Sequence, residues 1–92
     1  MSRGQAELLI AMLENDTCLI YTEPDIDGDE SKFGWHLWRG GERGPRINGP
    51  AVRGLEAKGL IARVDGAPNV MLLTSAGEEA ARAALALREA AA

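Results

Sequence analysis

The expected fold is decided by one stretch of the sequence, Asn48-Gly49-Pro50-Ala51-Val52-Arg53-Gly54-Leu55-Glu56-Ala57-Lys58-Gly59-Leu60-Ile61. Asn48 is a favourable N-cap, and Pro50 is tolerated in the first turn of a helix, where N–H groups have no partner within the helix. Val52 and Leu55 are three residues apart and share one face of that helix. Gly59 follows Lys58 in the position of a C′ glycine, which predicts that the helix ends there in a sharp turn.

Downstream of this helix, the sequence predicts a β-hairpin and a last helix. Residues 61–65 and 70–73 are expected to be strands, with a turn over residues 66–69. Thr74 or Ser75 is expected to cap the final helix, because Ser75-Ala76-Gly77-Glu78 has the spacing of a capping box. This helix continues through Leu87, and residues 88–92 are expected to fray.

Residues 48–85 resemble the C-terminal half of a winged helix-turn-helix domain. The resemblance rests on the helix, the run Lys58-Gly59-Leu60-Ile61, the hairpin with Arg63, and the run Leu73-Thr74-Ser75-Ala76-Gly77. In that family the helix is the recognition helix, which lies in the major groove of DNA, and the hairpin is the wing. The resemblance therefore implies a DNA-binding function.

Upstream, the sequence predicts a helix and a hairpin. Apolar residues at Ala6, Leu9, Ile10 and Leu13 have helical spacing, which predicts a helix over about residues 4–14. Residues 17–22 and 33–38 are expected to be two paired strands joined by an acidic connection. Residues 40–49 are rich in Gly, Arg and Pro and are expected to form a loop.

We therefore expect one α+β domain over residues 1–92, winged-helix-like, in the order helix, β-hairpin, helix, two-stranded wing, helix. A standard family member has a second helix where this chain has its first hairpin. The order with the hairpin is similar to that of small bacterial relatives of topoisomerase-inhibitor toxins.

Composition excludes several classes of protein. Cys18 is the only cysteine, so no internal disulfide forms, and the longest strongly apolar run, residues 8–13, is too short to span a bilayer. We expect a cytoplasmic protein with no membrane role. The net charge of −4 argues against unselective nucleic-acid binding, but residues 39–63 carry six bases and two acids, a local excess of +4.

This basic stretch supplies the candidate nucleic-acid contacts. Arginines in the expected loop would clamp phosphates together with the free N–H groups at the start of the helix. Arg53 is the best candidate for reading a base, and Arg63 would touch the backbone from the wing. The full set is Arg39, Arg43, Arg46, Asn48, Arg53, Lys58 and Arg63.

A second set of residues suggests protein contacts. Trp38 is predicted on the strand face opposite Trp35, together with His36, and an exposed tryptophan beside arginines is typical of an interaction hot spot. Asp27 and Asp29, in the acidic connection, would engage a basic partner surface. Packing of Trp38 against the first helix is the alternative.

No catalytic, metal or cofactor site is expected. The acidic run from Asp25 fails the calcium-loop pattern, because its sixth position is Glu30 and its twelfth is His36. His36 is the only histidine, so the common zinc sites cannot form within one chain. A nucleophile pair of Cys18 and His36 is conceivable on neighbouring strands, but a small buried thiol is the favoured interpretation.

Two functions follow from these observations. The first is a DNA-binding regulator or accessory factor that holds double-stranded DNA, with a homodimer through the Ala-rich last helix as an option. The second is a protein-interaction module or small inhibitor that acts on a nucleic-acid-processing enzyme. The basic stretch favours the first, and the overall acidity favours the second.

Overall fold

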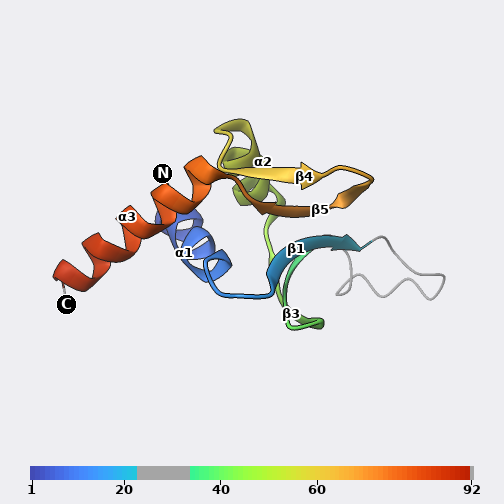
Figure 1. The fold of residues 1–92 in the computed structure, drawn as a ribbon, viewed down its shortest axis with the longest axis horizontal. Helices are drawn as coiled ribbons and strands as arrows, with labels where there is room; N and C mark the ends of the chain where they lie inside the picture. Colours follow the sequence, from blue (N-terminus) through green and yellow to red (C-terminus); the bar gives the residue numbers. More distant parts are fainter. Residues whose placement is uncertain (23–33, 92) are drawn as a thin grey trace.

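The computed structural model describes residues 1–22 and 34–91. In chain order the elements are α1 (Arg3–Met12), β1 (Thr17–Thr22), β2 (Gly34–Arg39), β3 (Glu42–Ile47), α2 (Gly49–Ala57), β4 (Ile61–Val64), β5 (Ala67–Leu73) and α3 (Ser75–Ala91). The strands form one antiparallel sheet in the order β3-β2-β1-β5-β4 (Figure 1). The fold is therefore α+β.

The predicted winged-helix order is wrong. The expected loop over residues 40–49 contains β3, and β5 pairs with β1 through Leu19 and Met71, so both hairpins belong to one five-stranded sheet. Gly40 and Gly41 have φ of +58° and +81°, and they form the tight turn that returns the chain from β2 into β3. The sequence of β3 holds few strand formers, and its pairing with β2 overrides that weak propensity.

Several local predictions are confirmed. The antiparallel pair of β1 and β2 begins with Thr17 opposite Arg39. The Asn48 side chain accepts a hydrogen bond of 2.8 Å from the Ala51 amide at the start of α2. Gly59 ends α2 with φ of +73°, and the next amide, that of Leu60, donates to the Leu55 carbonyl.

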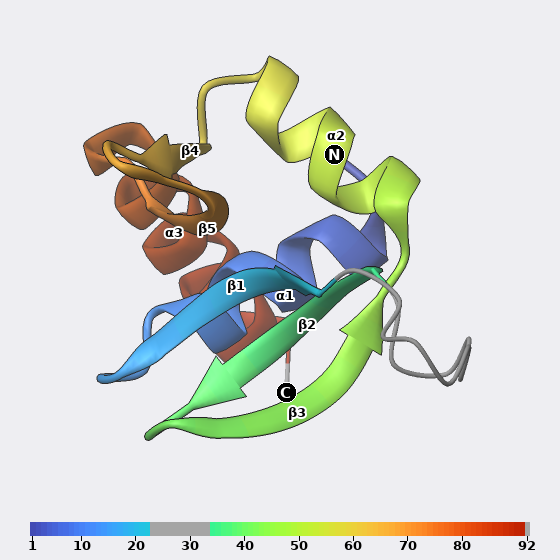
Figure 2. The same ribbon diagram turned by 90° about the vertical axis from the view of Figure 1, so that its right-hand side faces the viewer.

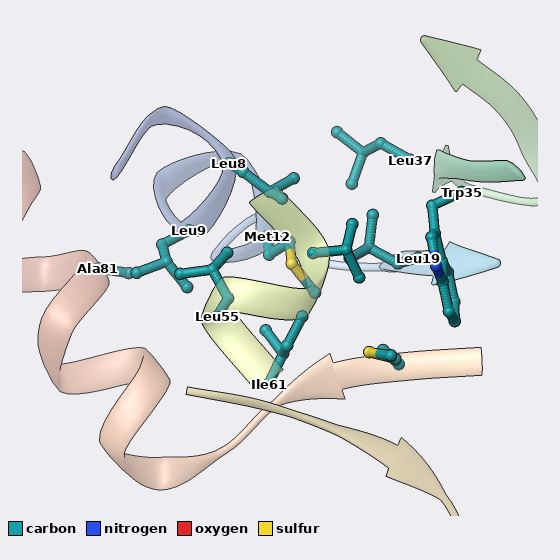
Figure 3. Close-up of a cluster of buried hydrophobic side chains, with 11 residues drawn as sticks. Leu8, Leu9, Met12, Leu19, Trp35, Leu37, Leu55, Ile61 and Ala81 are labelled. Carbon is teal, nitrogen blue, oxygen red and sulfur yellow. The ribbon is translucent and has the colours of Figure 1, made fainter. Parts of the chain in front are cut away.

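One hydrophobic core lies between the helices and one face of the sheet. In Figure 3, leucines of α1 point toward Leu55 of α2, and Leu19 and Leu37 close the cluster from the sheet. The buried members are Leu8, Leu9, Met12, Leu19, Trp35, Leu37, Val52, Leu55, Ile61, Met71 and Ala81. Burial of these apolar side chains is the main stabilising term of the fold.

α3 packs against α1 in its first half and then extends beyond the rest of the domain (Figure 1). Its distal half exposes 73% of Leu87. The helix runs through Ala91. None of the helices in residues 1–22 and 34–91 combines the length and hydropathy needed to cross a membrane.

Candidate nucleic-acid interface

The candidate site lies on the side of β1, β2 and β3 that faces away from α1. Figure 2 shows α1 and α3 behind these strands, and no helix of the described chain in front of them. Leu19, Trp35 and Leu37 point into the core, so the residues that alternate with them point the other way. We call this surface the outer face; it carries Cys18, Ile20, Thr22, Gly34, His36, Trp38, Arg43, Arg46, Val70 and Leu72.

A β-bulge places two arginines together on the outer face. Arg46 is opposite His36 and Arg43 is opposite Trp38, so three steps along β3 match two along β2. Without the extra residue, strict alternation would put arginines three apart on opposite faces. Gly44 lies within the bulge, where a Cβ would collide with the Leu37 carbonyl oxygen. The close approach of the two backbones therefore requires glycine there.

Both arginines are exposed and without an ion pair in the part of the chain that the structure describes. The Arg46 guanidinium extends toward Gly34, whose missing side chain leaves room for it: the Arg46 Nε lies 3.4 Å from the position a Cβ would take. By register, the described residues place no carboxylate on the outer face. The local charge is therefore positive on a chain of net charge −4.

The centre of the outer face is aromatic and holds polar atoms without partners. Trp38 is half-buried and lies opposite Cys18, whereas His36 is 4% exposed and lies opposite Ile20. His36 Nδ1, Trp38 Nε1 and Thr22 Oγ1 are buried with no hydrogen-bond partner among the described residues. All three belong to the same face of the same pair of strands, so this face concentrates polar groups that a bound water, ion or ligand would satisfy.

Cys18 and His36 lie on the same face as diagonal neighbours and are not a direct cross-strand pair. Cys18 is opposite Trp38 in the register, and burial raises the pKa of its thiol. A raised pKa lowers the fraction of thiolate, which is the reactive form. Within the described residues, no three His, Cys, Asp or Glu side chains are placed to hold a metal ion.

Two of the predicted basic contacts are engaged within the fold. The Arg39 Nε lies 3.0 Å from a carboxylate oxygen of Glu14. Arg63 makes a 3.0 Å ion pair with Glu56, donates to the Pro68 carbonyl, and lies 5.7 Å from the ring centroid of Trp35. Arg63 thus ties β4 to α2 and to the core, and its contact with a nucleic-acid backbone stays a prediction.

The remaining predicted contacts belong to α2. Asn48 uses its side chain as the N-cap, and Arg53 folds back over Gly49 in the first turn. Lys58 Nζ lies 3.4 Å from the side-chain oxygen of Gln5. Arg43, Arg46, Arg53 and Lys58 are therefore the predicted cations that form no ion pair with a described carboxylate. Asp27 and Asp29 lie outside the described residues.

A groove lies next to Arg46, between the end of β3 and the helices. It has a volume of about 530 Å³ and lies between α1, the end of β3 and the first turn of α2. Its walls are mostly apolar, with Arg46 and Asn48 among the polar residues at its border. Sequence reasoning missed this groove, because its walls come from three separate segments.

Sequence reasoning placed Trp38 and His36 on one strand face but missed that Arg43 and Arg46 share it. Two signals in the sequence could have indicated the strand β3. The pair Gly40-Gly41 favours a tight turn, and the step Gly44-Pro45 favours a bulge at a sheet edge. No protein-family model matches this chain, and no significantly similar curated protein or solved structure was found. Function is therefore inferred from the site itself.

Proposed function

We propose that this domain binds nucleic acid, using the arginines of β3 and the cations of α2 to contact phosphates. The observation that carries the proposal is the bulge in β3, which brings Arg43 and Arg46 onto one face beside Trp38. Arginine is well suited to this contact, because its planar guanidinium makes paired hydrogen bonds with phosphate oxygens.

The distribution of charge supports the same function. The arginines of the outer face have no described carboxylate beside them, whereas Arg39 and Arg63 form exposed ion pairs with Glu14 and Glu56. The net charge of −4 makes the chain as a whole unfavourable for nucleic-acid binding. Binding is therefore expected only where the arginines of β3 and the cations of α2 lie, so the nucleic acid must approach from that side.

The test is fluorescence anisotropy with labelled 20-nucleotide DNA, single-stranded and duplex, in low salt. The double variant Arg43→Ala/Arg46→Ala is expected to lose most of the binding. Arg82→Ala/Arg88→Ala is the matched control, because it removes the same charge from exposed positions on α3. Equal affinities for the two double variants would show that net charge, and not the site, governs binding.

A protein partner is the second candidate function, and the apolar part of the outer face favours it. Trp38, half-buried, shares this face with Leu72, which is exposed, and with the half-buried Ile20 and Val70. Tryptophan and arginine are enriched at the centres of protein interfaces. Absence of binding to either DNA at low salt would favour this alternative, and a pull-down with Trp38→Ala as the negative control would then test it.

A further inference from the structure

We infer that the outer face binds single-stranded nucleic acid in preference to duplex, with Trp38 stacking on a base while Arg43 and Arg46 hold the adjacent phosphates. This inference rests on the proposed function and names its substrate class. It follows from the side-by-side placement of an aromatic strand and a basic strand on one helix-free surface.

The shape of the surface selects against a duplex. Proteins that read the duplex from its major groove insert a helix or a two-stranded ribbon, and the base faces are hidden within the stack. The outer face instead presents three paired strands, with β2 in the middle and the arginines on the edge strand β3. A single strand exposes its bases, which stack on aromatic side chains of such sheets.

The position of Trp38 suits stacking. The indole has one polar atom, Nε1, and that atom is buried, so any exposed surface of the ring is carbon. Arg43 lies directly opposite Trp38 across the β2–β3 pair, and paired strands are about 4.8 Å apart. A base on the ring would therefore place its backbone near the arginines.

The unpartnered polar atoms are an independent observation that points to a ligand. His36 is more than nine-tenths buried, its Nδ1 has no described partner, and it lies opposite Arg46. On the same face, Thr22 Oγ1 and Trp38 Nε1 are also buried atoms without a described hydrogen-bond partner. Base edges and phosphates offer donors and acceptors that would satisfy such groups after small side-chain movements.

Charge complementarity identifies the occupant as a polyanion, and the aromatic centre identifies it as one with bases. An acidic peptide would satisfy the arginines but supplies no regular series of planar rings. The inference therefore requires both elements together: loss of the arginines weakens binding to every polyanion, whereas loss of Trp38 weakens binding only to single strands.

The experiment compares three probes on the full chain: a 20-nucleotide oligothymidylate, a 20-base-pair duplex and poly-L-glutamate. The oligothymidylate is expected to bind more tightly than the duplex and to quench the tryptophan emission. Trp38→Leu is expected to weaken oligothymidylate binding roughly 5- to 150-fold, the effect of losing one stacked base, and Trp38→Phe is expected to restore most of it. Far-UV circular dichroism confirms that each variant is folded.

Quenching in the unaltered protein provides a readout that does not depend on a variant. Trp35 is 8% exposed and lies in the core, so a change in emission on binding reports mainly on Trp38. Equal affinity for duplex and single strand, or undiminished binding by Trp38→Leu, would overturn the inference and leave the proposed function standing. No binding of either DNA would overturn both, and equal quenching by poly-L-glutamate would replace them with an acidic peptide partner.

Discussion

Among the glycines that the structure describes, Gly77 has the least room for a side chain. A Cβ there would collide with the Leu60 carbonyl oxygen and would lie 3.1 Å from Leu73 Cδ2. The Leu60 carbonyl also accepts a 3.1 Å hydrogen bond from the Thr74 amide, so the obstructing atom belongs to a fixed backbone. This close approach explains in structural terms the glycine in the run Leu73-Thr74-Ser75-Ala76-Gly77.

We therefore expect Gly77→Ala to lower the free energy of unfolding by about 1–3 kcal/mol, the usual effect of overpacking. The measurement is urea denaturation followed by circular dichroism. Gly4→Ala is the matched control, because Gly4 lies in α1 with nothing near its Cβ position, and alanine there should be neutral or stabilise the helix by up to about 1 kcal/mol. Equal midpoints for the two variants would refute the close approach of α3 to the Leu60 carbonyl.

Burial affects the titration of the Cys18 thiol by raising its pKa. Because desolvation raises its pKa above the ordinary 9.0, we expect alkylation by iodoacetamide at pH 8 to be slower than in the chain unfolded by urea. The protonated Cys18 thiol also contributes to the free energy of unfolding. This contribution is fully present below pH 9.0 and is lost as the pH rises through the higher pKa of the folded state. The measurement is the alkylation rate by mass spectrometry between about pH 7 and 10.

Oligothymidylate bound to the outer face should slow this reaction further, because Cys18 is opposite Trp38. Alkylation faster in the folded chain than in the unfolded chain would contradict the pKa direction. It would also reopen the hypothesis of an activated thiol paired with His36.

At the scale of elements, the bulge in β3 is the feature on which the site depends. Gly44→Ala would push β3 away from the Leu37 carbonyl, and we expect faster amide exchange in β2 and β3 together with weaker oligonucleotide binding. The loss of stability should be about 1–3 kcal/mol. Amide hydrogen exchange by mass spectrometry checks the first effect, and anisotropy checks the second.

Gly54→Ala is the control for this variant. Its Cβ would meet the Nε2 of Gln5, the end of a flexible side chain, and not a backbone atom. Exchange in β2 and β3 should stay unchanged in this control. If Gly44→Ala also left both exchange and binding unchanged, the bulge would not position the arginines.

The elements that the sequence predicts well are those defined by local chemistry. The cap at Asn48, the C′ glycine at Gly59 and the pairing of β1 with β2 each depend on a few neighbouring residues. β3 could not be predicted, because its alternation is broken by Gly44 and Pro45 and its stability comes from pairing with β2. The joining of β5 to β1 depends on contacts between residues about fifty apart, which no local pattern encodes.

For the candidate site too, the sequence predicts what depends on single residues and not what depends on contacts between elements. The sequence identifies the residue types that matter, Arg43, Arg46 and Trp38, from charge and aromatic content. It does not assign them to one surface, because the phase of a bulged strand is set by the contact between Gly44 and Leu37. Nor does it show that Arg39 and Arg63 form ion pairs, since their partners Glu14 and Glu56 are distant in the sequence or belong to other elements.

At the scale of the whole molecule, the number of available cations fixes the salt dependence of binding. Of the predicted cations, Arg43, Arg46, Arg53 and Lys58 form no ion pair with a described carboxylate. Arg43 and Arg46 belong to the outer face, whereas Arg53 lies in α2 and Lys58 is its C-cap, so the slope is worked out for two contacts and for four. Each phosphate contact contributes about 0.7 to the slope of log affinity against log salt for single strands. Four contacts predict about a 50-fold loss of affinity between 50 and 200 mM salt, and two predict about a 7-fold loss.

We therefore expect the affinity for oligothymidylate to fall between about 7- and 50-fold over this range, measured by anisotropy. If all six bases of residues 39–63 met phosphates, the affinity would fall about 300-fold over this range. Arg39 and Arg63 would then have to leave their ion pairs. Arg43→Ala/Arg46→Ala should reduce the slope by about 1.4, whereas Arg82→Ala/Arg88→Ala should leave it unchanged. An unchanged slope in the first variant would mean that the phosphates lie elsewhere, because counterion release counts only the cations that meet them.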